Sequence, residues 1–186
     1  MKFVLCSRIR AISGAALLWC LSGTASADEC ALTVSQPVLD FGQTQRTQLM
    51  QGAREGQRLL VGTRVISLNL SCAENTGVAL GFTGERATDQ GYRFAQDGFF
   101  TLKVLSAQLD GKPVHLMVRD GEGGMQDSDN QLRPGVSPTP GYQNQIARGS
   151  KFSAQVEVST YVDMRDTRVR SQSQWNGGGQ FSIDTF

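Results

Sequence analysis

The sequence has little of what catalytic centres, membrane spans and nucleic-acid surfaces usually need. Its 186 residues include a single histidine, His115, and the 18 basic and 17 acidic residues nearly cancel. A charge balance this close to neutral gives no support to nucleic-acid binding. Beyond residue 27, no apolar run reaches the length of a membrane span. Helix-favouring runs are also few, whereas 21 glycines and many Gln, Thr, Ser and Val residues indicate strands joined by turns.

The N-terminus has the pattern of a secretory signal peptide. A basic start is followed by an apolar run over residues 11–21 and by the small-residue cleavage site Ala25-Ser26-Ala27. We therefore predict that residues 1–27 are a signal peptide and that residues 28–186 form one secreted domain. Cleavage removes three of the 18 basic residues and none of the 17 acidic ones, which leaves 15 against 17 and a net charge of −2.

Cleavage also decides which cysteines can pair. Cys6 and Cys20 leave with the signal peptide, so the mature domain keeps only Cys30 and Cys72, in an oxidising compartment. We predict one disulfide between them, worth about 3 to 4.5 kcal/mol on the chain-entropy model. Two bridged cysteines and one histidine cannot build a zinc site, so we expect no metal and no cofactor.

Alternation of apolar and polar residues predicts two long strands, over residues 63–72 and 151–163. A period of two over such lengths means that one face of each strand is buried and the other is exposed to solvent. The core-facing residues are Ile66, Leu68, Leu70 and Cys72 in the first strand, and Phe152, Ala154, Val156, Val158 and Val162 in the second.

Shorter strands and turn signals complete an all-β pattern. Asp110-Gly111 is a hairpin signal. Pro37 interrupts the alternation of the first strand, which predicts an edge strand that bends or changes sheet. We expect long surface loops over residues 120–141 and 165–179. The shorter strands are expected at residues 30–34, 77–82, 99–105 and 113–118. Such strands, with a disulfide from the first to the second, predict an immunoglobulin-like sandwich, with a barrel as the alternative.

Several segments follow one another in the order and spacing of a known family. They are Cys30-Ala31-Leu32, residues 39–43 (LDFGQ), 66–72 (ISLNLSC) and 78–84 (VALGFTG), then the long alternating strand, a Gly-rich turn at 177–179 and a closing strand that ends in Phe186. In these features the chain resembles the chaperone–usher fimbrial subunits, over nearly the whole mature domain. Each motif is degenerate by itself.

The resemblance implies an incomplete, pilin-type immunoglobulin-like sandwich that lacks its final strand. A periplasmic chaperone, and then a neighbouring subunit, would fill the open groove with an extended segment. Residues 180–186 would form one lip of this groove, with the terminal carboxylate held by basic groups of the chaperone. The residues expected at the groove are Phe152, Val156, Val158, Phe181, Ile183 and Phe186. The alternative interpretation is that Phe181 and Ile183 fill a complete core.

The chain departs from a polymerising pilin at its mature N-terminus. Such subunits carry an apolar-alternating donor extension ahead of the first cysteine, whereas predicted cleavage leaves only Asp28-Glu29 before Cys30. Two residues span less than about 7 Å, which is too short to pair along a neighbour. The resemblance then implies a tip or minor fimbrial subunit at the cell surface, reached through the periplasm and assembled by an outer-membrane usher, a chaperone and neighbouring subunits.

No catalytic constellation is visible, and we predict that the chain is not an enzyme. His115 is out of phase with its apolar neighbours, which is typical of a solvated strand residue, and no nucleophile motif accompanies it. A tip subunit could instead bind a host-surface receptor through exposed aromatic residues. The candidates are Trp175, Tyr142 and Tyr92, each with packing under a loop as its alternative role.

Two other classes of protein stay open from the sequence. One is a self-complete secreted β-sandwich binding module, spore-coat-like or periplasmic, which would fold alone. The other is a small secreted enzyme with a dispersed active site. An open groove would expose more apolar surface than monomers usually tolerate, so a fimbrial subunit should aggregate or be degraded without its chaperone.

Overall fold

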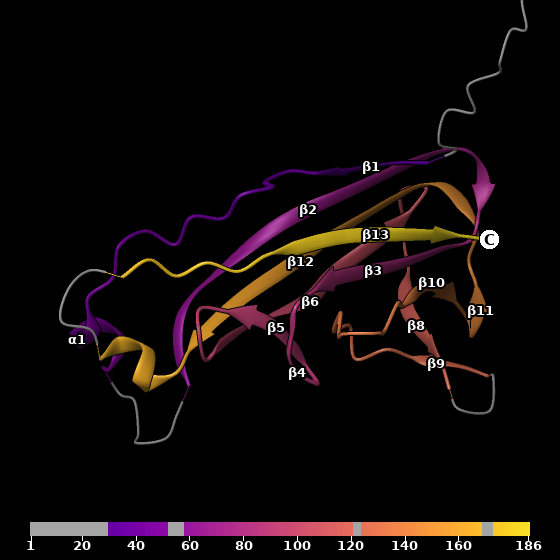
Figure 1. Ribbon diagram of the computed structural model, residues 1–186. Helices are drawn as coiled ribbons and strands as arrows, with labels where there is room; N and C mark the ends of the chain where they lie inside the picture. Colours follow the sequence, from indigo (N-terminus) through magenta and orange to yellow (C-terminus); the bar gives the residue numbers. More distant parts are fainter. Residues whose placement is uncertain (1–29, 52–57, 121–123, 169–172) are drawn as a thin grey trace, which may run out of the picture.

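Nearly all regular structure in the computed structural model is β-strand, as predicted (Figure 1). The structure describes residues 30–51, 58–120, 124–168 and 173–186. Helical structure in this part consists of a single turn, α1 (Arg46–Leu49), and a 3₁₀ turn, η1 (Met164–Thr167). In the same residues, no helix has the length and apolar character to span a bilayer.

The strands are β1 (Cys30–Val34), β2 (Leu59–Thr76), β3 (Val78–Gly84), β4 (Arg86–Thr88), β5 (Gly91–Phe94), β6 (Gly98–Leu109), β7 (Lys112–Pro113), β8 (His115–Arg119), β9 (Met125–Asp127), β10 (Thr139–Tyr142), β11 (Gln145–Ile146), β12 (Gly149–Val162) and β13 (Gly179–Thr185).

The main sheet is antiparallel, with the order β1-β2-β12-β6-β5-β4 and with β7 beside β6. Its long central strands β2 and β12 contain the two predicted alternating segments. Phe152, Val156 and Val158 are at most 6% exposed, as alternation requires for the face turned to the core. The alternation prediction is therefore confirmed for both strands.

A second layer covers one face of the main sheet. It contains the pair β13-β3 and the small sheet β11-β10-β8-β9, and Figure 1 shows β3 and β13 running over β12 and β6. The backbone N–H of Leu80 in β3 donates to the carbonyl of Pro138, 2.9 Å away, which joins the two parts of this layer. Leu68, Leu80 and Val156 are completely buried between the layers. The predicted sandwich is confirmed, and the barrel alternative is not needed.

The predicted disulfide is present. Cys30 and Cys72 lie directly opposite each other in the β1–β2 register, with their Cα atoms 4.0 Å apart and their sulfurs bonded. The bond therefore ties the first strand covalently to the long second strand.

The Asp110-Gly111 hairpin is also confirmed. Both residues have positive φ, 49° and 76°, and Leu109 pairs with Lys112 across them, as a two-residue turn of the primed type requires. The Asp110 carboxylate also accepts the backbone N–H of Lys151 at 2.9 Å. The turn thus holds the beginning of β12 in place.

One predicted surface loop contains a core residue. Within residues 120–141, Leu132 is completely buried, and its N–H donates to the carbonyl of Leu102 in β6 at 2.9 Å. The segment forms an irregular extra edge of β6, without the alternation that would reveal a strand. The expectation of a simple surface loop was therefore wrong at this point.

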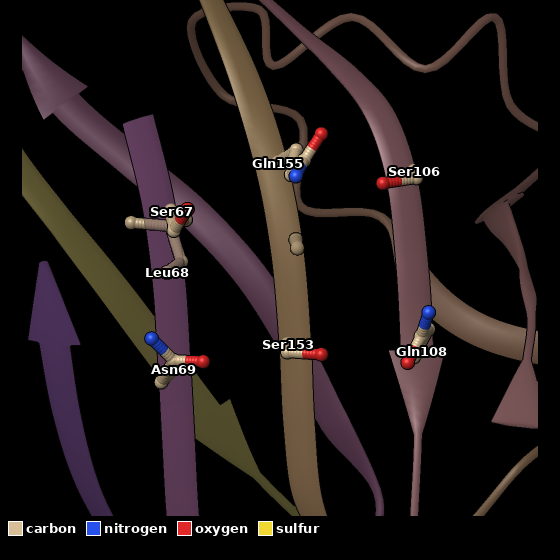
Figure 2. A pocket seen from close by; sticks show the side chains of 8 residues that line it. Ser67, Leu68, Asn69, Ser106, Gln108, Ser153 and Gln155 are labelled. Carbon is tan, nitrogen blue, oxygen red and sulfur yellow. The ribbon is translucent and has the colours of Figure 1, made fainter. Parts of the chain in front are cut away.

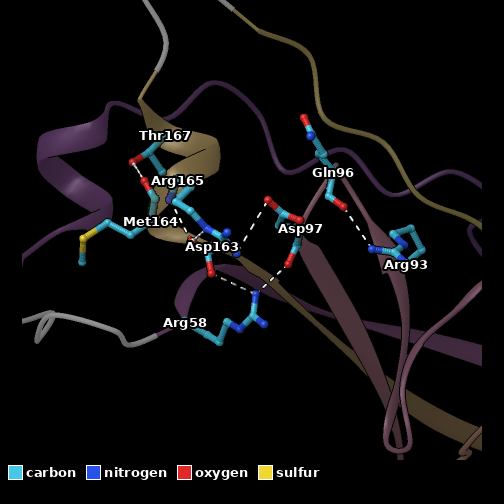
Figure 3. Close-up of polar contacts among 8 residues, drawn as sticks. All are labelled: Arg58, Arg93, Gln96, Asp97, Asp163, Met164, Arg165 and Thr167. Carbon is cyan, nitrogen blue, oxygen red and sulfur yellow. Dashed lines mark hydrogen bonds and ion pairs between the residues drawn. The ribbon is translucent and has the colours of Figure 1, made fainter.

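Charged side chains close the end of the sandwich near η1 (Figure 3). The Asp163 carboxylate lies 3.1 Å from the Arg165 guanidinium and 3.3 Å from that of Arg58, and Arg58 also donates to the carbonyl of Asp97 at 2.6 Å. The backbone and side-chain hydrogen bonds from Arg165, with added attraction from Arg58, lower the pKa of Asp163. This charged cluster ties the start of β2 and the β5–β6 turn to the end of β12.

Candidate functional site

Two edge strands, one in each layer, border the same side of the core. In the part of the chain that the structure describes, β1 pairs only with β2, and β13 pairs only with β3. Figure 1 shows β13 on the β1 side of β3, so the unpaired edge of β13 is turned towards the β1 side of the molecule. We call these two unpaired strand edges the open edges.

Apolar side chains at the open edges face the core but are only half-buried. On β13, Ile183 lies opposite Leu80, and on β1, Val34 lies opposite Leu68. Leu68 and Leu80 are completely buried, whereas Val34 and Ile183 keep part of their surface exposed. The half-buried core-facing residues of β1, of the segment after it and of β13 are Leu32, Val34, Leu39, Phe181 and Ile183. Val34 and Ile183 at the open edges are therefore less well covered than Leu68 and Leu80, their partners on the neighbouring strands.

The apolar residues of β13 are also the residues whose backbone groups face the unpaired edge. Phe186 and Gly77, which continue the β13–β3 register, exchange two backbone hydrogen bonds of 3.1 and 3.0 Å. In an antiparallel ladder such pairs alternate with pairs that make no hydrogen bond. Phe181 and Ile183 occupy the second kind of position, so their N–H and C=O groups point away from β3, towards the unpaired edge.

The β1 edge has the same arrangement. Ser35 donates its N–H to the carbonyl of Ser67 at 2.9 Å, directly after the last β1–β2 pair. Counting back along the ladder, Val34 and Leu32 fall at positions whose backbone groups point away from β2. On both open edges, the residues that present apolar side chains to the core are therefore also those with outward backbone donors and acceptors.

The predicted groove residues fall into two sets. Phe152, Val156 and Val158 lie on the central strand β12 as fully buried core residues, and Phe181 and Ile183 pack against the same core from the edge strand. Phe186 stands apart at the end of β13, 49% exposed. Its ring packs on Gly77, and the Arg148 guanidinium lies 6.0 Å from the ring centroid. The β1 residues Leu32 and Val34 were missing from the predicted set, although their alternation in the sequence was visible.

Of the two roles predicted for Tyr92, receptor contact or packing residue, the structure shows the packing residue. Tyr92 is 1% exposed, stacks on Phe100, and donates its hydroxyl to the carbonyl of Phe82 at 3.0 Å. Burial raises its pKa to about 12. Of the other candidates, Tyr142 is 60% exposed at the end of β10, and Trp175 is half-buried in the segment before β13.

In the described ranges, no group of three or more His, Cys, Asp or Glu residues could hold a metal ion. His115 is exposed at the start of β8, as its phase in the sequence predicted. The arrangement at the open edges suits pairing with another strand.

The chain has a distant structural likeness to known proteins. No protein-family model and no curated protein sequence matches the chain. Among solved structures, the chain is similar to the P pilus rod subunit PapA, with 14% sequence identity and a TM-score of 0.42, over 85% of this chain and 99% of that chain. A likeness this distant carries no argument about function.

Proposed function

We propose that the chain is a subunit of a bacterial fimbria of the chaperone–usher type, which accepts a strand from another chain between its open edges. The observation that carries this proposal is the coincidence of half-buried apolar side chains and outward backbone groups on β1 and β13. An extended segment laid between them would cover Leu32 and Val34 on one side and Phe181 and Ile183 on the other. It would also satisfy the backbone groups of both edges, which is the physics of strand addition.

The partners follow from this mode of folding. Before assembly, a periplasmic chaperone supplies the strand, and in the fibre a neighbouring subunit supplies it. An outer-membrane usher exports the product to the cell surface. The resemblance in sequence to fimbrial subunits and the disulfide between the first two strands are consistent with this route, since disulfides form in the periplasm.

The position in the fibre is proposed to be terminal or minor. Cys30 is the first residue of β1 and is fixed to β2 by the disulfide. If signal peptidase cuts after Ala27, Asp28-Glu29 is all that precedes it, about 7 Å of extended chain. A subunit of this kind accepts a strand and donates none, so it belongs at the tip. Mass spectrometry of the secreted protein tests this proposal. A longer mature N-terminus would contain a donor segment and would indicate a shaft subunit.

The strand-acceptor function is tested by recovery of the mature domain from periplasm, with and without a co-expressed fimbrial chaperone. We expect soluble protein only with the chaperone. Ile183→Asp places a charge among the half-buried residues of the open edge and should abolish recovery with the chaperone. Gln180→Asp is the matched control, because Gln180 is exposed on the opposite face of β13. A stable, strand-free monomer would show a self-complete sandwich and overturn the proposal.

A further inference from the structure

The segment before β13 contains the pair Asn176-Gly177, the only place in the sequence where an asparagine precedes a glycine. Both residues are exposed. They lie beside the end of β5, where Gly177 and Phe94 form an isolated antiparallel bridge. The bridge fixes the course of the chain just before β13 begins at Gly179.

The hydrogen bonding at this bridge leaves the nitrogen of Gly177 accessible. The N–H of Ala95 donates to the carbonyl of Asn176 at 2.9 Å. In an antiparallel bridge with this pattern, the residues on either side of the bridging pair make the bonds, so the N–H of Gly177 points away from β5. Within the described residues, no backbone carbonyl accepts that N–H.

Three features favour attack of this nitrogen on the Asn176 side chain. Glycine has no Cβ, so its nitrogen is little crowded and its backbone turns easily. The bond from Ala95 puts a donor on the carbonyl of the same peptide, which stabilises the negative charge that this peptide carries when its nitrogen loses the proton. Among the described residues, the Asn176 amide makes no hydrogen bond that would hold it away from the nitrogen.

We propose that Asn176 is a site of spontaneous deamidation in the folded domain. The nitrogen of Gly177 attacks the side-chain carbon Cγ of Asn176 and closes a succinimide ring. The bond between Cγ and the amide nitrogen breaks, and ammonia leaves with the proton from Gly177. Water then opens the ring at either of its two carbonyls, which gives aspartate or isoaspartate.

The two products differ in their effect on β13. Aspartate keeps the backbone and adds only a charge. In isoaspartate the main chain runs through the side-chain carbon, so the backbone gains a methylene just before Gly177. The bond from Ala95 to residue 176 and the pairing of Gly179 with Gly84 then cannot both keep their present geometry. The chemistry does not depend on the proposed function, although its effect falls on one of the open edges.

The experiment incubates the folded mature domain, with its chaperone bound if it needs one, at mildly alkaline pH before peptide mass spectrometry. Exchange of the amide NH₂ for OH gives a defined mass gain, and an isoaspartyl methyltransferase labels the isoaspartate. We expect both signals in the peptide that contains Asn176. Asn69 is the internal reference, because it is also exposed but lies in β2 between β1 and β12 and precedes Leu70 (Figure 2).

Asn176→Gln should abolish the mass gain, because its longer side chain would have to close a larger ring. Gly178→Ala is the matched control and should leave the rate unchanged, since a Cβ there meets no atom within 4 Å outside its chain neighbours. Gly177→Ala is unsuitable, because its Cβ would lie 2.6 Å from the carbonyl oxygen of Arg93 and would break the bridge.

The inference fails if Asn176 stays intact in the folded domain while a synthetic peptide of residues 173–180 is converted, because the fold would then protect it. It also fails if Asn69 is converted as fast as Asn176. Hydrogen exchange at the start of β13 should be faster in the converted protein than in Asn176→Asp, which carries the charge alone. Equal exchange would refute the effect on β13.

Discussion

Strands β12 and β13 have the same kind of sequence and different surroundings. Both alternate apolar and polar residues, with Phe152 and Val156 in one and Phe181 and Ile183 in the other. In β12 these side chains are at most 2% exposed, whereas in β13 they are only half-buried. The difference arises because β2 and β6 flank β12 on both sides, while β13 pairs, among the described residues, with β3 alone. Alternation decides which face of a strand turns inward, and the number of flanking strands decides how well that face is covered.

The two edge strands also differ from each other. β1 is held to β2 by backbone bonds and by the Cys30–Cys72 disulfide, whereas β13 is held to β3 by a backbone ladder that ends with the Phe186–Gly77 pair. If a partner strand enters between them, β1 is the fixed edge and β13 the edge that can adjust. Substitutions in β12, β1 and β13 can test the difference between β12 and β13 and the difference between β1 and β13.

The largest loss of stability is expected from a residue of β12, which has a strand on each side. Phe152→Ala should lower the free energy of unfolding by about 3 to 5 kcal/mol, because it leaves a cavity in a closed part of the core. Urea titration followed by circular dichroism measures the change. Lys151→Ala, at the neighbouring exposed position, should stay within about 0.5 kcal/mol of the natural domain. Equal losses for the two variants would contradict the assigned faces of β12.

The disulfide comes next. Replacing Cys30 and Cys72 together by alanine should lower the free energy of unfolding by about 3 to 4.5 kcal/mol, because the unfolded chain loses a constraint. Hydrogen exchange should also speed up selectively in β1, while exchange in β13 changes little. A uniform acceleration over both edge strands would show that the bond does not act locally on the β1 edge.

Phe181→Ala should cost the isolated domain about 1 to 2 kcal/mol, since the ring is only half-buried. With a donor strand or chaperone bound, the cost should rise towards the value for a buried phenylalanine, because the partner completes the cover. Unfolding is measured in both states. Phe152→Ala is the control and should cost the same in each. An unchanged cost for Phe181→Ala would mean that no strand enters beside β13.

The smallest effect concerns the charged cluster at the η1 end, far from the open edges. Because the folded state lowers the pKa of Asp163, its contribution to stability is present above the pKa of the unfolded chain and is lost as the pH falls through the folded value. Asp163→Asn should therefore lower stability near neutral pH and change it little in strong acid, which flattens the decline between the two. Thermal unfolding from pH 7 to pH 3 measures this, and parallel curves for the two proteins would refute the assignment.

Much of the fold could be predicted because its signals are local. The alternating segments of β2, β6 and β12, the Asp110-Gly111 turn and the pairing of Cys30 with Cys72 all follow from period, turn chemistry and the number of cysteines left after cleavage. Leu132 was misjudged because it stands in no long alternating run and is buried against β6, where its N–H donates to the carbonyl of Leu102. Tyr92 kept two possible roles because its burial depends on Phe82 and Phe100 in neighbouring strands, and that pairing is not visible in its local pattern.

The sequence likewise predicted one part of the candidate site, and the structure decided the other. The sequence by itself determined that Phe181 and Ile183 share one face of a strand and that the cysteines join the first strand to the second, because period and covalent pairing are properties of the chain. Only the tertiary structure decided that, within the described residues, β1 pairs with β2 alone and β13 with β3 alone. Strand order depends on which distant segments pair, and no local pattern records that choice.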